Sequence, residues 1–260
     1  MKHWIKRALA TGAVLAIGFL LWLGHIGYFG GPVFLEMPAV EKRSPTPPAV
    51  AVIFSGDMGF RIGMGPQIAR RFVHDGVPVL GVSSLVYFRH ERTPAEVRAL
   101  ITEASRKALA FSHAERLILI GQSFGADMLH VGITDLPPDL RKKVQMVGLV
   151  VPGQTVIYRA SPSELFNWAT PDAQALPTAA QLTWAPVVCI QGIDETDSLC
   201  PQLTQPNVKH IALPGGHPLH RDADKLYATL RAEMAATNPH LINITKSSVP
   251  RHVTSIHGGA

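Results

Sequence analysis

Three kinds of side chain in this sequence are suited to acyl-transfer chemistry, and each follows an apolar run. Ser123 is the centre of GQSFG, the acidic stretch DETD covers residues 194–197, and His217 lies within LPGGHPLH. A serine hydroxyl becomes a nucleophile when an imidazole accepts its proton, and a carboxylate fixes the tautomer of that imidazole. The residue types and their order therefore predict a Ser–acid–His triad.

His217 is the histidine that we expect in this triad. His210 lies inside a predicted strand, and His220 begins the last predicted helix, where packing, capping and surface roles are ordinary. His217 instead follows Gly215 and Gly216, which allow the backbone to turn sharply towards a site.

The acid is less clearly marked, because Asp194, Glu195 and Asp197 share one short loop. Glu195 comes three residues after Gly192, a usual place for such an acid. Asp197 begins the turn DSLCP, which a disulfide at its cysteine would hold in place. We rank Asp197 first and Glu195 second, with little to separate them.

An oxyanion hole must accompany the nucleophile, because backbone N–H groups stabilise the negative charge of the transition state. We expect one donor to be the backbone N–H of Phe124, directly after the serine. The second donor should come from SGDMGF, residues 55–60, through the N–H of Asp57 or Met58.

Apolar runs alternate with helix-like segments along most of the chain. The expected strands cover residues 49–56, 77–85, 116–121, 144–153, 185–192 and 208–216. The expected helices cover residues 65–76, 93–112, the segment from Phe124, and 221–236; Thr93 with Glu96 forms a capping box. This alternation predicts a mostly parallel sheet of about six strands with helices on both faces. The carboxyl ends of such strands share one edge, and the order Ser, acid, His is typical of an α/β-hydrolase fold.

The N-terminal segment, residues 1–35, has the character of a membrane anchor or signal. Lys2, Lys6 and Arg7 precede residues 8–35, which contain no Asp, Glu, Lys or Arg. The apolar part is long enough for a transmembrane helix, and the preceding positive charge predicts a cytoplasmic N-terminus with an exported domain. Because no cleavage site is evident, we favour an uncleaved inner-membrane anchor over a signal peptide whose removal leaves a soluble periplasmic domain.

Beyond the anchor we expect a single folded domain. The expected parts are a Pro-rich linker over 36–48, the α/β-hydrolase domain over 49–237 and a polar, disordered tail over 238–260. Residues 153–183 are irregular, and Phe166 with Trp168 could form a small cap over the site.

The composition of the chain limits which classes of protein and binding partner are expected. The 260 residues are 47% hydrophobic and 17% charged, which excludes a wholly disordered chain, and the net charge of +5 favours anionic partners. The motifs indicate no metal, no cofactor and no nucleic-acid site. The two cysteines, Cys189 and Cys200, either close a short loop worth about 3 kcal/mol or remain buried free thiols.

Five motifs in order, VIFSGDMGF, GVPVLGVSSLVYFRHERTP, LILIGQSFGADML, CIQGIDETDSLCP and LPGGH, resemble the VirJ/AcvB family of bacterial virulence proteins over residues 49–235. The resemblance implies a periplasmic α/β-hydrolase that cleaves aminoacyl-phosphatidylglycerol, notably lysyl-phosphatidylglycerol. This sequence departs from the family pattern at four positions: Met58, Phe60, Ser83 and Pro218.

The expected partners follow from this resemblance: an aminoacylated phospholipid, the membrane and, as a further option, secretion-system proteins. Asp57 or Asp127 could face a lysyl ammonium group, although Asp127 is better explained as a local cap on its helix. Two other functions stay open: a non-catalytic accessory protein that binds proteins in a hydrolase-like cleft, and a general esterase or lipase.

Overall fold

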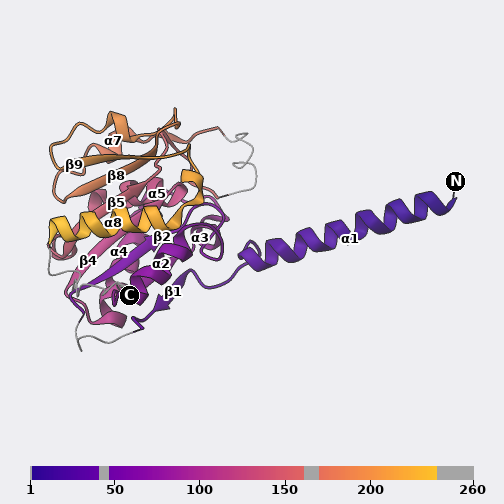
Figure 1. Ribbon diagram of the computed structural model, residues 1–260, viewed down its shortest axis with the longest axis horizontal. Coiled ribbons are helices and arrows are strands. Elements are labelled where there is room, and N and C mark those ends of the chain that lie inside the picture. Colours follow the sequence, from indigo (N-terminus) through magenta and orange to yellow (C-terminus); the bar gives the residue numbers. More distant parts are fainter. Residues whose placement is uncertain (1, 41–46, 161–169, 239–260) are drawn as a thin grey trace, which may run out of the picture.

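The computed structural model of the protein describes residues 2–40, 47–160 and 170–238 (Figure 1). The expected cap residues Phe166 and Trp168, and nearly all of the expected polar tail, lie outside these ranges.

A seven-stranded sheet forms the centre of the described part. Its strands are β1 (Phe34–Met37), β2 (Ala49–Phe54), β3 (Val79–Val82), β4 (Arg116–Gln122), β5 (Val144–Val150), β8 (Val187–Gly192) and β9 (Val208–Leu213). The strand order is β1-β3-β2-β4-β5-β8-β9, and every neighbouring pair is parallel except β1 with β3. All six strands expected from the apolar runs are present, so the predicted α/β-hydrolase sheet is confirmed.

Helices cover both faces of this sheet. The helices of the described part are α1 (Lys2–Ile26), α2 (Gly65–His74), α3 (Ser84–Phe88), α4 (Pro94–Ser112), α5 (Phe124–Gly132), α6 (Pro138–Arg141), α7 (Leu176–Ala179) and α8 (Ala223–Thr237), of which α4 and α5 cover one face and α2 and α8 the other. Short 3₁₀ turns are η1 (Ile133–Asp135), η3 (Cys200–Gln202) and η4 (Leu219–Arg221), and β6 (Thr155–Val156) pairs with β7 (Ala173–Gln174). Alternate side chains of β2 point to opposite faces: Val50, Val52 and Phe54 pack with α4 and α5, whereas Ala51 and Ile53 pack with α2 and α8.

Two expectations about strands need correction. Strand β1 was not expected, and it begins in the predicted anchor and ends in the predicted linker. It pairs antiparallel with β3 and forms one edge of the sheet, so the sheet starts well before residue 49. The second expected strand, 77–85, ends at Val82, because Ser83 is the N-cap of α3 and the chain becomes helical from Ser84.

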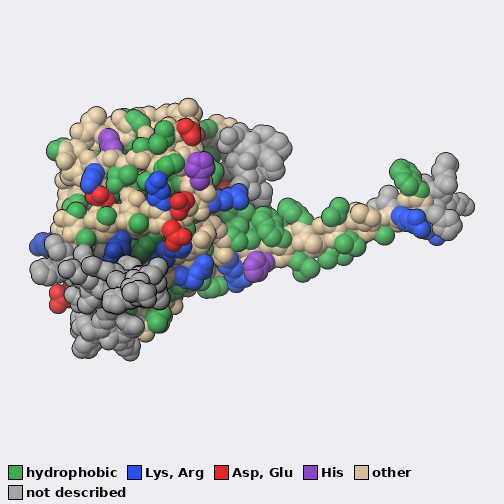
Figure 2. Space-filling view, viewed as in Figure 1, with side chains coloured by type: hydrophobic (Ala, Val, Ile, Leu, Met, Phe, Trp, Pro, Cys, Tyr) green, Lys and Arg blue, Asp and Glu red, His purple; other side chains and the backbone are tan. Residues whose placement is uncertain are grey.

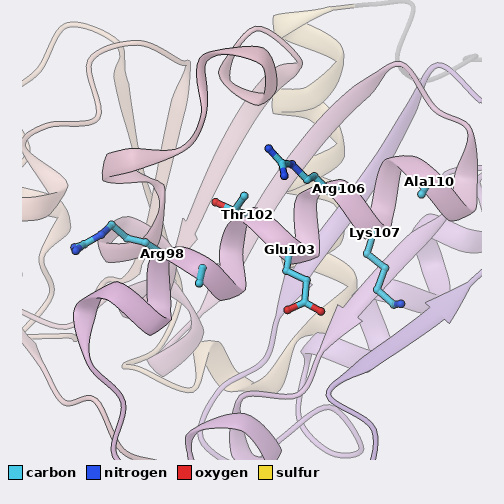
Figure 3. A pocket seen from close by; sticks show the side chains of 7 residues that line it. Arg98, Thr102, Glu103, Arg106, Lys107 and Ala110 are labelled. Atoms are coloured by element: carbon cyan, nitrogen blue, oxygen red, sulfur yellow. The ribbon is translucent and has the colours of Figure 1, made fainter.

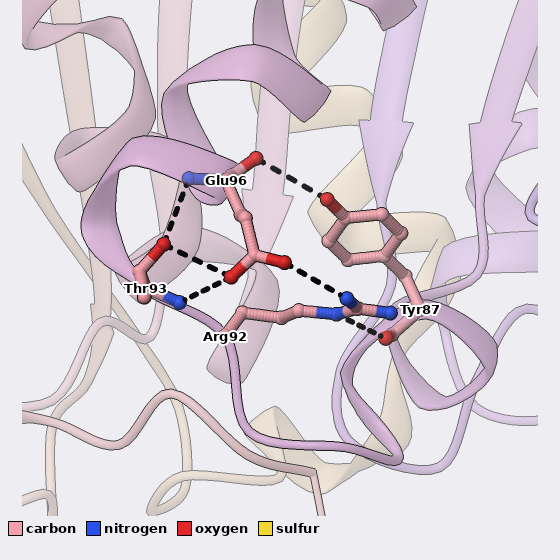
Figure 4. A network of polar contacts seen from close by, with 4 residues as sticks. All are labelled: Tyr87, Arg92, Thr93 and Glu96. Atoms are coloured by element: carbon pink, nitrogen blue, oxygen red, sulfur yellow. Dashed lines mark hydrogen bonds and ion pairs between the residues drawn. The ribbon is translucent and has the colours of Figure 1, made fainter.

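The start of α4 follows the sequence prediction in detail (Figure 4). The Oγ1 of Thr93 accepts a hydrogen bond from the backbone N–H of Glu96, and Oε2 of Glu96 accepts one from the N–H of Thr93. Arg92 donates to Oε1 of the same glutamate at 2.9 Å, and Tyr87 donates to its backbone carbonyl at 3.3 Å. This capping box fixes where the longest helix of the domain begins.

Helix α1 extends away from the domain, with its N-terminus far from the sheet (Figure 1). Residues Leu9–Ile26 have a mean hydropathy of 1.9, so among the described residues this one helix is long and apolar enough to cross a membrane. A signal sequence passes the same test of length and composition. Only its last turns contact the domain, through buried Leu23 and Ile26.

Cys189 and Cys200 form a disulfide between the middle of β8 and the start of η3, so the predicted pairing is confirmed and the option of free thiols is wrong. The bond closes the loop that follows β8, which contains all three candidate acids.

Removing the disulfide should destabilise the domain, because the unfolded chain gains freedom when the loop is no longer closed. Replacing both cysteines with alanine is expected to lower the free energy of unfolding by about 3 kcal/mol, measured by chemical denaturation of the detergent-solubilised protein. Reduced wild type should shift in the same direction. An unchanged unfolding midpoint in both samples would contradict this role.

Candidate active site

The nucleophile position is a sharp turn between β4 and α5. Ser123 has φ 52° and ψ −126°, a backbone conformation that residues other than glycine rarely adopt. Its backbone N–H donates to the carbonyl of Val150 on β5 at 2.8 Å, and its carbonyl accepts from the N–H of Ala126 at 2.7 Å. Bonds to both sides of the turn hold this strained residue, which is the arrangement of a nucleophile elbow.

The two glycines of GQSFG are needed because the turn packs against other backbone. A Cβ at Gly121 would collide with the backbone of Gly125 and Ala126, and a Cβ at Gly125 would collide with the carbonyl oxygens of Phe54 and Ser55. Helix α5 therefore starts directly against the end of β2, which brings Ser123 beside the loop that follows β2.

Ser123 and His217 are joined by a hydrogen bond, as the sequence predicted. Oγ of the serine lies 2.7 Å from Nε2 of His217, and Nδ1 of the same ring lies 2.6 Å from Oε1 of Glu195. In the neutral ring that donates from Nδ1 to the carboxylate, Nε2 is free to accept the serine proton. His210 is exposed on the edge strand β9, and the ring of His220 packs beside Gly215, so neither replaces His217.

Glu195, our second choice, is the acid that contacts His217, and our first choice, Asp197, does not contact it. The Glu195 side chain is 2% exposed and contacts the imidazole, whereas Asp197 and Asp194 are exposed. Oε2 of Glu195 accepts from the backbone N–H of Gly192 at 3.1 Å, so both carboxylate oxygens have partners. The backbone around Asp197 pairs with the loop after β5, and its carbonyl accepts a hydrogen bond from the backbone N–H of Gln154 at 3.1 Å. This pairing holds Asp197 away from His217.

The loops that contain the acid and the histidine pack closely. The backbone N–H of Asp194 donates to the carbonyl of Gly215 at 3.1 Å. A Cβ at Gly192 would collide with the carbonyl oxygens of Gly215 and Gly216, so the end of β8 touches the turn before the histidine. Gly192 is thus the sequence signal that best locates the acid.

Electrostatics prepare His217 to act as a base. The hydrogen bond that His217 donates to Glu195 raises the pKa of His217 above its ordinary value, partial burial opposes the shift, and the negative charges of Glu195, Asp127 and Asp197 add to it. A proton that His217 takes up is therefore stabilised, which is what a general base at this position would need.

A cavity of about 260 Å³ opens beside the nucleophile. Ser123, His217, Asp57 and Met58 are among the residues that line it. The backbone N–H of Phe124 lies in the first turn of α5, where N–H groups have no partner within the helix. The placement of these residues agrees with the expected oxyanion hole, which remains a prediction.

Asp57 is the carboxylate nearest the expected oxyanion donors. Burial raises the pKa of Asp57, while hydrogen bonds from the N–H groups of Met58 and of Asp57 itself oppose the shift. Because one of these two N–H groups is the expected second oxyanion donor beside that of Phe124, a bound ester must share it with the Asp57 side chain or displace that side chain.

Asp127 has a mainly structural role, but its contact is with a distant loop and is not the local cap on its helix that the sequence favoured. Its Oδ1 accepts from the backbone N–H of Gly153 at 2.9 Å, linking α5 to the loop after β5. Burial raises the pKa of Asp127 to about 8, and Asp127 does not line the cavity beside Ser123.

Other residues of the site were not predicted. Val151 lines the cavity and has a φ of 46°, which is strained for a β-branched residue. A valine in the sequence does not indicate such a conformation, so the sequence could not have predicted it. Ser84 donates from its Oγ to the carbonyl of Ser55 at 2.6 Å and from its N–H to Oγ of Ser55 at 3.0 Å. This pair of bonds fixes the start of the loop that contains Asp57; the SS dipeptide before α3 was its only sequence signal.

A larger hollow, of about 720 Å³, lies along the outer side of α4 (Figure 3). Arg98, Glu103, Arg106 and Lys107 are among its lining residues, all on this one helix. Arg98 pairs with Asp135 at 3.1 Å, which partly neutralises this surface. The hollow contains no member of the triad, so the smaller cavity is the candidate active site.

Comparison with known proteins supports this description. A family model described as "Bacterial virulence protein (VirJ)" matches residues 48–238. The comparison with curated protein sequences gave no match.

Among solved structures, Est1E from Butyrivibrio proteoclasticus with bound ferulic acid has a TM-score of 0.58 at 12% identity, covering 78% of this chain and 95% of that one. Proline iminopeptidase from Mycobacterium smegmatis has a TM-score of 0.54 at 12% identity, covering 78% and 94%. Esterase Pf2001 from Pyrococcus furiosus has a TM-score of 0.53 at 14% identity, covering 78% and 91%. At these identities the likeness shows the shared fold.

Glu195→Gln should impair catalysis and change its pH dependence. The rate constant for a soluble p-nitrophenyl ester is expected to fall by about 10³–10⁴-fold, because the amide cannot stabilise the imidazolium. The base must be neutral, so kcat/KM of wild type should rise with pH through the pKa of His217, which is raised from the ordinary value of a histidine. Loss of the glutamate removes the main cause of the raised pKa, so this acid limb should move to lower pH.

Asp197→Asn is the matched control, since it makes the same chemical change on the same loop at an exposed side chain. We expect it to keep a rate and a pH profile close to those of wild type. Equal losses in both variants, or a greater loss in Asp197→Asn, would contradict the assignment of Glu195.

Proposed function

The chain belongs to the VirJ family of bacterial virulence proteins, and from this premise we propose that it is a serine esterase, anchored in the inner membrane, that cleaves the ester of aminoacyl-phosphatidylglycerol in the periplasm. The observation that carries the proposal is the continuous hydrogen-bonded chain from Ser123 through His217 to buried Glu195. Lysyl-phosphatidylglycerol is the substrate that we would test first.

The chemistry proceeds in two acyl-transfer steps. Oγ of Ser123 attacks the ester carbonyl while Nε2 of His217 takes its proton, and backbone N–H groups stabilise the resulting oxyanion. The intermediate breaks its bond to the glycerol oxygen, which leaves with the proton from His217 and yields phosphatidylglycerol. Water then gives a proton to His217 and attacks the acyl-enzyme; return of that proton to Ser123 releases the free amino acid.

The cavity favours an ester with a positive charge near its carbonyl. An α-aminoacyl group carries its ammonium one carbon from the reacting carbonyl, and that carbonyl must lie at Oγ of Ser123. Asp57 lines the same cavity, and its partly buried carboxylate gains a counter-ion when such a group binds. Every aminoacyl group carries this α-ammonium. The contact with Asp57 therefore selects aminoacyl esters as a class and does not distinguish one amino acid from another.

The proposed location rests on two features. The apolar window Leu9–Ile26 of α1 follows the basic residues Lys2, Lys6 and Arg7, which favours a cytoplasmic N-terminus and a domain on the outer side of the inner membrane. The Cys189–Cys200 disulfide is typical of an oxidising compartment such as the periplasm.

The two competing functions differ from this proposal in testable ways. A non-catalytic partner of a secretion system has no need of an aligned triad, so a fluorophosphonate probe should label Ser123 only if the site is catalytic. A general esterase or lipase would hydrolyse neutral acyl esters as fast as aminoacyl esters.

Wild-type protein in vesicles that contain lysyl-phosphatidylglycerol should release free lysine, measured by mass spectrometry. Ser123→Ala is expected to release it at least about 10³-fold more slowly, because the nucleophile is lost. Equal release by the two proteins would exclude catalysis by Ser123. If wild type releases no lysine but still reacts with the fluorophosphonate, lysyl-phosphatidylglycerol is excluded as the substrate, and the proposal that the protein is a serine hydrolase stands.

Asp57→Asn should act on substrate choice, since the amide keeps the shape of the side chain and loses its charge. We expect kcat/KM for lysyl-phosphatidylglycerol to fall by about tenfold or more, the value of a hydrogen bond to a charged group. Hydrolysis of a neutral acyl ester should change much less. Equal losses on both esters would indicate a role in the oxyanion loop in place of ammonium binding.

A further inference from the structure

The loop after β2 has the catalytic cavity on one side and the end of α1 on the other. Asp57 and Met58 line the cavity with Ser123. From the same loop, Arg61 donates to the backbone carbonyl of His25 on α1 at 2.7 Å. A Cβ at Gly59 would lie 3.2 Å from the carbonyl oxygen of Ile26, so helix and loop are in direct contact.

The helix joins the domain without a flexible spacer. Leu23 and Ile26 are buried in the same core cluster as Leu85 of α3. Val33 follows shortly, and its carbonyl accepts from the N–H of Ser83 at 2.8 Å. Strand β1 begins at the next residue and pairs with β3. The direction of α1 is therefore fixed relative to the cavity.

This attachment sets the height of the cavity above a bilayer. The apolar window Leu9–Ile26 spans about 27 Å as a helix, close to the hydrocarbon thickness of roughly 30 Å. When α1 crosses the membrane, Ile26 lies where the hydrocarbon ends. The loop that contacts Ile26, and the cavity on its other side, then lie among the lipid headgroups.

The side chains exposed at this level suit a lipid surface. Trp22 is 41% exposed and Phe29 is 59% exposed, and aromatic rings of this kind favour the membrane–water boundary. Arg61 is exposed, and Arg89 lies close to the backbone at Gly30. Figure 2 shows hydrophobic side chains along α1 and basic side chains where the helix meets the domain. Arginine pairs well with lipid phosphate groups.

We propose that Trp22, Phe29, Arg61 and Arg89 form a docking surface for the anionic phospholipids of the leaflet in which the protein is anchored, and that this surface holds the catalytic cavity at headgroup level. The enzyme then takes its ester from the adjoining leaflet without extracting the lipid from the bilayer. This inference rests on the proposed function for the identity of the ester and for α1 as a retained membrane anchor, whereas the docking does not depend on which ester is cleaved.

The first test measures depth without any substrate. Full-length Arg61→Cys, labelled with a polarity-sensitive dye, is placed in vesicles of phosphatidylglycerol and phosphatidylcholine. We expect a blue-shifted emission that is lost when about 12 Gly/Ser residues, spanning roughly 20 Å as a coil, are inserted between Gly30 and Gly31. The same emission in both proteins would overturn the proposal.

The second test measures turnover in vesicles that also contain lysyl-phosphatidylglycerol. The Gly/Ser insertion should slow lysine release several-fold, and the double variant Arg61→Glu/Arg89→Glu should slow it by about tenfold or more. Arg106→Glu on α4 makes the same charge change on another surface and should have no effect. Hydrolysis of a soluble p-nitrophenyl ester should stay constant in all of them, which shows that they fold.

The outcomes separate the two proposals. Wild-type rates of lysine release in the insertion and in the double variant would overturn the docking surface and leave α1 as a simple tether. No lysine release from any vesicle, together with a blue-shifted dye and hydrolysis of the soluble ester, would overturn the lipid substrate and support the docking surface.

Discussion

The close contact between the end of β2 and the start of α5 is the constraint on which the rest of the site depends. Backbone packs directly on backbone there, because glycine at 121 and 125 removes the side chains that would separate them. The contact forces Ser123 into its positive φ and turns its hydroxyl towards His217. It also brings the loop after β2 beside the nucleophile, so one packing contact positions both the attacking atom and the expected oxyanion donors.

The contact between His217 and Glu195 depends on a second set of short-range contacts at the other half of the sheet. Glu195 is held through Gly192 at the end of β8, and the following residues are held by pairing with the loop after β5 and by the disulfide to Cys200. A charged side chain that is almost fully buried costs free energy unless both of its oxygens have partners, and here they do. The loop after β8 holds the Glu195 carboxylate against His217, and this contact is the main cause of the raised pKa of His217.

The sequence predicted the parts of this arrangement that depend on local pattern. Buried strands appeared as apolar runs, Thr93 and Glu96 marked the start of α4, and the two glycines around Ser123 marked the elbow. It failed where the outcome depends on the path of the chain in space. Strand β1 is four residues long and follows the apolar helix α1 after residues 27–33, which also lack charged side chains, so its residues could not be distinguished from the predicted anchor. Asp197 and Glu195 have the same chemistry, and only the contacts of the folded loop separate them.

The position of β1 has a consequence for where the chain can be cut after α1 without damage to the sheet, whether α1 is a signal sequence or the proposed anchor. A peptidase that cuts within residues 27–33 would leave β1 attached and the sheet complete at that edge. A cut later in the chain, in the proline-rich segment before residue 49, would strip β1 from β3 and expose a row of unpaired N–H and C=O groups, which can pair with another molecule. A cut within residues 27–33 is therefore compatible with a free, monomeric domain. A cut just before residue 49 is not, because the exposed edge of β3 favours pairing with another molecule.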